Sequence, residues 1–457
     1  MSAWQEALRA GISRARTLDR PVVVASRQSI AERTEFLELY AAAETRGQRR
    51  FFAARPQDGF ELLGLGITSE ILAPEPDAGA AVMGRALTLL HEADPDALLL
   101  GGYAFLPRSA SERDPVWRSR ANARFTLPAL VLTREHSEQW LTRIALAYPE
   151  DSVEELTQRS RQLAMTLLEA APPSQPSHVR LSAGTDVGDA PRYEETAAEI
   201  IAAIRRGEAQ KVVLARTERF ALEGHLSTSA VLQLLCEAHP SCFIFAEGLA
   251  HDTFLGATPE GLIRRRGDRV ESSAVAGTVA RANTSSEAAR LADTLCRSPK
   301  EQAEHAFVVR AIEEGLAGFC RGLEVPAAPS LLDTGNVQHL HTLIRGRLRQ
   351  PTHVLELVAC VHPTPAIAGT PRERALELIR KHEHFDRGAY AGPIGYFDAR
   401  GDGEFVVALR CGLIADDALH LFAGAGLVAD SDPRSEAAET TLKLRTLREA
   451  VEAACRA

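Results

Sequence analysis

The chain of 457 residues is long enough for one large domain or two average ones, and 45% apolar residues can supply a substantial core. A net charge of -9 gives no general basic field, so we expect no nucleic-acid partner, and an anionic ligand would need a local cationic cluster. The N-terminus lacks a signal-peptide pattern and no apolar run approaches twenty residues, so we expect no membrane span. The seven cysteines form no CxxC pair, which favours free thiols and a cytoplasmic location.

The first part of the chain predicts packing elements and no chemistry. Strand-like runs occur at 51–52, 61–67 and 97–100. Residues 153–171 have the spacing of an amphipathic helix. A stretch rich in Pro, Ser and Gly follows at 171–191 and predicts a surface connection between two sequence regions.

Beyond that connection, strands and helices mix without a strict alternation. Residues 193–204 have helical spacing, Gly207 follows as a stop, and KVVLART at 211–217 predicts a strand. Further strands are predicted at 242–246, 253–255, 405–410 and 419–422, and helices at 299–319, 371–382 and 433–454. This order favours an α+β class with largely antiparallel sheets.

Two of these helices carry acidic faces. Glu436, Glu439 and Lys443 are spaced by three and four residues, which puts them on one face of the last helix. Glu301 and Glu304 share a face in the same way. A solvated face with a Glu–Lys pair would explain either helix alone. Together the four carboxylates could form an oxygen-rich site for a hard cation such as Mg²⁺.

Nine blocks between residues 190 and 453 resemble the chorismate-utilising enzymes, and among them the isochorismate synthases. The blocks are KVVLART (211–217), FLGATPEGLIRR (254–265), AVAGTVAR (274–281), SPKEQAEHAFVVRAI (298–312), NVQHL (336–340), HPTPAIAGTP (362–371), RGAYAGPIGYFD (387–398), DGEFVVALR (402–410) and FAGAGLVADSDPRSEAAETTLK (422–443). The resemblance implies two large, mainly antiparallel sheets flanked by helices. Residues 1–175 would form the N-terminal part of the fold, similar to that of menaquinone-type members, and residues 190–457 the catalytic region of one integrated domain.

The resemblance also implies an acid–base pair. Lys211 would activate water for attack at carbon 2 of the chorismate ring, and Glu260 would protonate the hydroxyl that leaves carbon 4. Such a pair is needed because water is a weak nucleophile and hydroxide a poor leaving group. The pKa of Lys211 would have to be lowered for this role near neutral pH.

The remaining site residues are implied in the same way. Glu301, Glu304, Glu436 and Glu439 would bind the Mg²⁺ that holds the ring carboxylate, with Glu304 and Glu439 as the direct ligands. Tyr390 and Arg410 would bind the enolpyruvyl carboxylate, a task that suits a guanidinium fork. Backbone and small groups at Gly277, Thr278, Gly424 and Gly426 would approach the substrate, Lys443 would add positive charge, and His339 would donate or accept a hydrogen bond near the ring.

Single positions separate related activities. Aminodeoxychorismate synthases carry a lysine where this chain has Ala276, and salicylate synthases tend to have threonine where it has Ala366. The tryptophan-sensing LLES motif of anthranilate synthases is absent. We therefore expect release of isochorismate by a monomer or weak homodimer, with salicylate synthase or an anthranilate synthase-like component as alternatives. The pathway, for menaquinone, a siderophore or salicylate, stays open, and the N-terminal similarity favours menaquinone.

One alternative comes from a different class, a metal-binding hydrolase. His339 with His341 and His382 with His384 could supply imidazoles. Pairs at i,i+2 on a helix would not face one way, and the spacing is not that of a zinc site. Consumption of chorismate would argue against this alternative.

Overall fold

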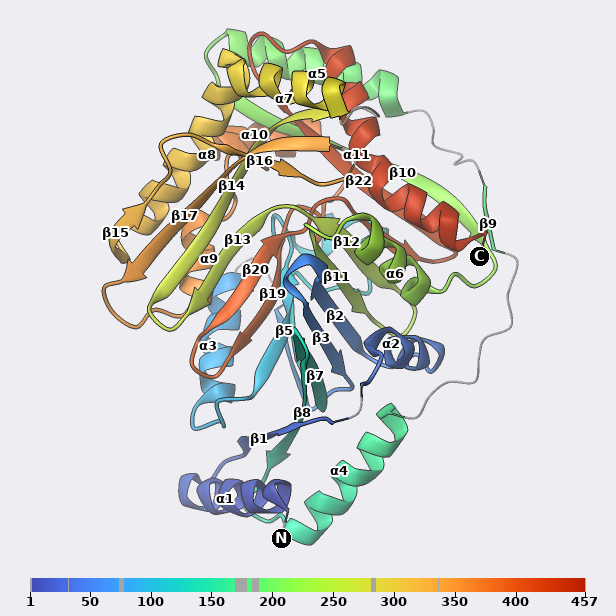
Figure 1. The fold of residues 1–457 in the computed structure, drawn as a ribbon, viewed down its shortest axis with the longest axis vertical. Helices are drawn as coiled ribbons and strands as arrows, with labels where there is room; N and C mark the ends of the chain where they lie inside the picture. The colour runs from blue at the N-terminus through green and yellow to red at the C-terminus, as the bar shows by residue number, and fades with distance from the viewer. Residues whose placement is uncertain are drawn as a thin grey trace.

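Two large sheets, built throughout by antiparallel pairing, form the centre of the computed structural model (Figure 1). The structure describes residues 2–31, 33–73, 78–168, 179–182, 189–280, 285–335 and 337–456. Within these residues one sheet has twelve strands and the other has ten. The predicted α+β class with two large antiparallel sheets is confirmed.

The larger sheet runs in the order β1 (Val22–Ser29), β8 (Glu138–Ala147), β7 (Leu130–Glu135), β3 (Phe60–Leu65), β2 (Arg50–Arg55), β11 (Phe243–Gly248), β12 (Thr253–Thr258), β21 (Cys411–Ala415), β22 (Ala418–Leu427), β10 (Lys211–Glu223) and β18 (Gly369–Thr370), with β9 (Arg180–Leu181) on β10. The smaller sheet runs β15 (Cys320–Glu324), β17 (Val337–Leu348), β14 (Arg269–Ala280), β13 (Gly261–Arg266), β20 (Gly403–Val407), β19 (Pro393–Asp398), β5 (Leu98–Tyr103), β6 (Ala123–Leu127) and β4 (Ser69–Ala73), with β16 (Ser330–Asp333) on β17. Each sheet combines strands from both halves of the chain, because β2 pairs with β11 and β5 pairs with β19.

The helices are α1 (Ala3–Leu18), α2 (Phe36–Thr45), α3 (Ala78–Leu90), α4 (Val153–Leu168), α5 (Asp189–Arg205), α6 (Thr228–Ala238), α7 (Ser285–Arg297), α8 (Pro299–Ala317), α9 (Val354–Val361), α10 (Arg372–His382) and α11 (Pro433–Ala454). Short 3-10 turns occur at Pro56–Asp58, Ala110–Glu112 and Pro115–Trp117. Figure 1 shows α5, α10 and α11 at one end of the molecule and α1 and α4 at the opposite end. Across the described ranges, every helix is too short or too polar to cross a bilayer.

Most predicted elements match, and one strand differs for a clear reason. The last helix has the predicted bounds of 433–454. The strand predicted at 405–410 ends at Val407, because Arg410 has a positive φ of 49° that an extended strand does not allow. The connection predicted at 171–191 lies outside the described residues at 171–178 and 183–188, and its described parts hold β9 and the start of α5.

Capping residues fix where the two acidic helices begin. Ser298 precedes a proline and its side chain accepts a hydrogen bond from the backbone N–H of Glu301 at the start of α8. Asp432 also precedes a proline and accepts from the N–H of Ser435 at the start of α11. A cap followed by proline sets the first turn of a helix. The carboxylates predicted to share a site therefore lie within the first two turns.

The main buried cluster joins the two sheets and includes aromatic side chains from both, such as Phe254 on β12 and Phe125 and Phe405 on the smaller sheet. A second buried cluster packs α2, α6 and α11 on the opposite face of the larger sheet. The strands that carry polar site residues, β10, β14, β17 and β22, are thus held from several sides.

Candidate active site

One cavity gathers most of the residues that the sequence predicted to act together. Its volume is about 100 Å³, measured as the space open to the centre of a water molecule. The predicted residues that line it are Glu260, Gly277, Thr278, Glu301, Glu304, His339, Ala366, Tyr390, Arg410, Gly424, Gly426, Glu436, Glu439 and Lys443. Lys211 is the remaining predicted residue, and it reaches the same place by contacting Glu304.

Glu260 lies in the turn between β12 and β13 and is 3% exposed. Burial raises the pKa of this carboxyl to about 7, although the charge of Lys211 and a hydrogen bond from Thr364 oppose the shift. The Thr364 hydroxyl donates to Oε1 of Glu260 at 3.4 Å. Glu260 can therefore hold a proton near neutral pH, as a general acid must.

Lys211 is the first residue of β10 and is 1% exposed. Its Nζ donates to Oε1 of Glu304 at 2.7 Å. Gly426, on the neighbouring strand β22, leaves room for this contact, because a Cβ there would lie 2.7 Å from Cε of Lys211 and 3.0 Å from the Glu304 carboxylate. Any larger residue at this position would push the ammonium and carboxylate apart.

A hydrogen-bond chain orients Arg410 toward the cavity. Burial, aided by the charge of Arg410, lowers the pKa of His339 to about 3, so the ring is neutral. Its Nδ1 lies 2.9 Å from the carbonyl oxygen of Gly277, which requires a proton on that nitrogen. Nε2 then accepts from Nη2 of Arg410 at 3.1 Å. The histidine acts as a neutral acceptor that fixes the guanidinium.

Glycine at position 277 is required for two reasons. A β-bulge interrupts the pairing of β14 with β17 between Ala276 and Thr278, and Gly277 at its centre has a φ of +71°. A Cβ at this position would also lie 2.9 Å from Oε2 of Glu301. The bulge therefore brings backbone from β14 against the carboxylates of α8.

The four predicted carboxylates line the cavity from two helices, but they do not form a closed metal cage. Lys443 bridges Oε1 of Glu439 at 2.6 Å and the carbonyl oxygen of Gly424 at 2.9 Å. Within the part of the chain that the structure describes, no group of three or more His, Cys, Asp or Glu side chains is close enough to enclose an ion. Oxygen donors arranged in this open way fit Mg²⁺, which usually keeps several waters and takes one or two carboxylates beside substrate oxygens.

Three residues at the site were not singled out from the sequence, although each lies in a block that carried the resemblance. Thr364 contacts Glu260, and Phe422 lines the cavity and stacks on Tyr390 with ring centroids 5.6 Å apart. Arg387 is buried and donates to the carbonyl oxygens of Val213 and Ile367 at 2.8 and 2.9 Å.

The Arg387 guanidinium also makes a bidentate ion pair with Glu383. Glu383 in turn accepts a hydrogen bond from the backbone N–H of Ala215 on β10. This buried pair ties the strand of Lys211 to the loop of Ala366. The pair lies 168 and 174 residues from the β10 residues that it contacts, Ala215 and Val213, which is why spacing alone could not reveal these contacts.

The helix assumed for the two histidine pairs is wrong for one of them. His339 and His341 lie on strand β17, where residues at i and i+2 share a face, and not on a helix. Their partners nevertheless differ. His339 contacts Gly277 and Arg410, whereas His341 lies near Ser273 and Ser330.

Comparisons with known proteins identify the family of the chain. Residues 10–452 match the model of the family described as chorismate binding enzyme. The chain is 35% identical to the salicylate biosynthesis isochorismate synthase of Pseudomonas aeruginosa over 97% of this chain and 93% of the relative. It is 34% identical to the isochorismate synthase MenF of Bacillus subtilis over 77% of this chain and 74% of that one.

A solved structure extends the likeness to three dimensions. The menaquinone-specific isochorismate synthase MenF from Escherichia coli superposes with a TM-score of 0.81 at 26% identity, covering 97% of this chain and 100% of that chain. The family model, a relative matched over most of its length and a solved structure all agree. The chain therefore belongs to the chorismate binding enzyme family.

Proposed function

We propose that this chain is an isochorismate synthase, which converts chorismate to isochorismate. Water adds at ring carbon 2, the double bonds shift, and the hydroxyl on carbon 4 leaves as water, so the net reaction is an isomerisation. The observation that carries the proposal is a buried carboxyl with a pKa of about 7, Glu260, in the wall of a cavity that the buried Lys211 reaches through its contact with Glu304. The full-length similarity to an isochorismate synthase supports it.

In this mechanism Lys211 acts in its neutral amine form, after losing its ammonium proton, and accepts a proton from the attacking water, while Glu260 donates one to the leaving hydroxyl. Tyr390 and Arg410 bind the enolpyruvyl carboxylate. Burial raises the pKa of Tyr390, so its hydroxyl stays protonated and can donate a hydrogen bond to an anion. The guanidinium of Arg410 is already oriented by His339.

Mg²⁺ is proposed as the cofactor. Glu304 and Glu439 would hold it directly, with Glu301 and Glu436 acting directly or through water. The ion would neutralise and position the ring carboxylate of chorismate. Without the ion, Lys211 pairs with Glu304 and Lys443 pairs with Glu439. These ion pairs offset the repulsion among the carboxylates of the cavity.

The product is proposed to be free isochorismate. Elimination of pyruvate requires the enolpyruvyl arm to fold over the ring, and a reactive conformer of this kind needs contacts on several sides. Ala366 lines the cavity with only a methyl group. We further propose that the protein acts in the cytoplasm, as a monomer or weak homodimer, for a menaquinone or siderophore pathway.

The test is incubation of the pure protein with chorismate and Mg²⁺, with and without ammonia, followed by chromatography of the products. Isochorismate in equilibrium with chorismate is the expected result, and isochorismate supplied alone should return chorismate. Salicylate and pyruvate formed at a comparable rate would identify a salicylate synthase. Anthranilate formed only with ammonia would identify an amine-adding enzyme.

A further inference from the structure

Trp117 is a fully buried side chain from the N-terminal half that lies just behind the cavity wall. It follows Pro115 and Val116 in a 3-10 turn and does not line the cavity itself. Its ring stacks on Phe422 with centroids 5.4 Å apart and an interplanar angle of 26°. Phe422 stacks in turn on Tyr390, at 5.6 Å and 18°. Trp117, Phe422 and Tyr390 thus form one continuous stack that ends in the cavity.

Trp117 also holds the loop that precedes Tyr390. Its Nε1 donates to the carbonyl oxygen of Asp386 at 2.9 Å. Gly388, two residues further on, has a φ of +52°, and a Cβ there would lie 2.2 Å from the indole ring. The indole therefore fits against bare backbone, and the position of the loop depends on the ring.

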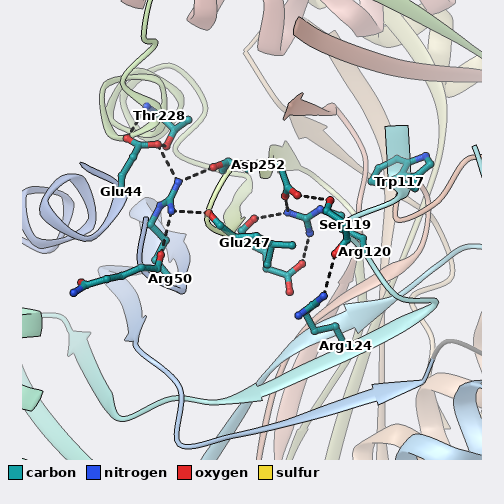
Figure 2. Close-up of polar contacts among 12 residues, drawn as sticks. Glu44, Arg50, Trp117, Ser119, Arg120, Arg124, Thr228, Glu247 and Asp252 are labelled. Atoms are coloured by element: carbon teal, nitrogen blue, oxygen red, sulfur yellow. Dashed lines mark hydrogen bonds and ion pairs between the residues drawn. The ribbon is translucent and has the colours of Figure 1, made fainter. Parts of the chain in front are cut away.

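Buried charges also fix the turn that carries Trp117. Figure 2 shows Arg120 between the carboxylates of Glu247 and Asp252, with Ser119 beside them. Nη2 of Arg120 donates to the carbonyl oxygen of Glu247 at 2.8 Å and to Asp252 at 2.5 Å. The backbone N–H of Arg120 bonds to the carbonyl oxygen of Trp117 at 2.9 Å. The turn is therefore locked to β11 and to the β11–β12 connection.

We propose that Trp117 is a positioning residue for substrate binding, which sets the place of Tyr390 through Phe422 and the 386–390 loop. The inference rests on the proposed function, in which Tyr390 binds a carboxylate of chorismate. It gives the N-terminal half a part in the chemistry that its sequence did not indicate. A carboxylate distant from the reacting carbons is bound alike in substrate and transition state, so its misplacement raises KM more than it lowers kcat.

The experiment compares Trp117→Phe with Trp4→Phe. Trp4 is also buried, 5% exposed, but belongs to a separate cluster with α1. Trp117→Phe should raise KM for chorismate by roughly tenfold, since displacements of about 1 Å can cost up to 10²-fold. Trp4→Phe should leave KM unchanged. A purely structural role would lower the active fraction and therefore the apparent kcat, with KM at the wild-type value, and that result would overturn the proposal.

A double-variant cycle with Tyr390→Phe tests the route. If Trp117 acts through Tyr390, the fold-increase in KM of the double variant should be well below the product of the fold-increases of the two single variants. A fold-increase equal to that product would show that the two residues act independently, and would overturn the proposal that Trp117 acts through Tyr390. An inactive wild type would overturn the proposed function and this inference together, whereas an active wild type beside an unimpaired Trp117→Phe variant would overturn this inference alone.

A second measurement decides the matter if Trp117→Phe does not fold. The chain has three tryptophans, so 5-fluorotryptophan labelling gives three fluorine resonances that single variants at Trp4 and Trp140 assign. Chorismate added without Mg²⁺ should shift the Trp117 resonance and leave the other two in place. An unshifted Trp117 resonance at saturating chorismate would overturn the coupling.

Discussion

Replacing Glu260 by glutamine should change how the stability of the protein depends on pH. Burial favours the protonated carboxyl, so the folded protein binds this proton more tightly than the unfolded chain. The stabilisation is complete below the ordinary pKa of 4.5 and is lost as the pH rises to about 7. The shift of about 2.5 pKa units, the difference between 7 and 4.5, corresponds to about 3 kcal/mol of unfolding free energy. Glutamine cannot ionise, so the variant lacks this loss.

The assay is urea unfolding of wild type and Glu260→Gln at several pH values between about 5 and 8, in chelator so that no cation contributes. The wild type should lose about 2–3 kcal/mol more than the variant across this range. Glu314→Gln removes the same charge from an exposed position on α8 and serves as the control. Stability differences that do not vary with pH would refute the buried, protonated state of Glu260. The same state predicts that kcat/KM of the wild type falls above about pH 7, because the general acid is lost.

Three other predictions concern the base, the cation and the buried charges. Lys211→Ala should lower turnover by roughly 10²-fold or more while circular dichroism still shows the native fold; Tm should fall because Glu304 loses its ion-pair partner, and near-normal turnover would remove Lys211 from the mechanism. Excess chelator should abolish isochorismate formation and Mg²⁺ restore it, with Glu439→Gln needing more Mg²⁺ for half-maximal activity; full activity in chelator would mean that the carboxylates serve another purpose. Arg120→Ala should destabilise the fold by about 3–5 kcal/mol in urea unfolding, because two buried carboxylates lose their partner. Arg345→Ala, whose pair with a neighbouring strand is half exposed, should cost less than about 0.5 kcal/mol, and equal effects of the two variants would contradict the argument.

Local rules predicted those parts of the fold that depend on neighbours in sequence. The periodicity of Glu436, Glu439 and Lys443 placed them on one helix face, and α11 has the expected bounds. The strand of Lys211 was predicted from its run of apolar β-branched residues. By contrast, the same rules misassigned the His339–His341 pair to a helix, since two residues are too few to reveal a period.

The assembly of the site depended on pairings that no spacing encodes. Lys211 and Glu304 are 93 residues apart and meet only because β10, β22 and α8 converge. The resemblance predicted that they belong to one site, and the roles of both residues stay predictions until activity is measured. Trp117 escaped notice because it carries no titratable group and lies in the half of the chain where the resemblance is loose.

The pairing of β5 with β19 has a consequence for how the protein is made. Gly101 on β5 is matched with Gly395 on β19, 294 residues later in the chain. At typical rates of synthesis, β5 therefore lacks its partner strand β19 for roughly 15 to 60 s. An apolar strand with one free edge is a site for wrong pairing throughout that time. Premature termination or slow translation in the second half should therefore yield aggregates rather than a folded fragment.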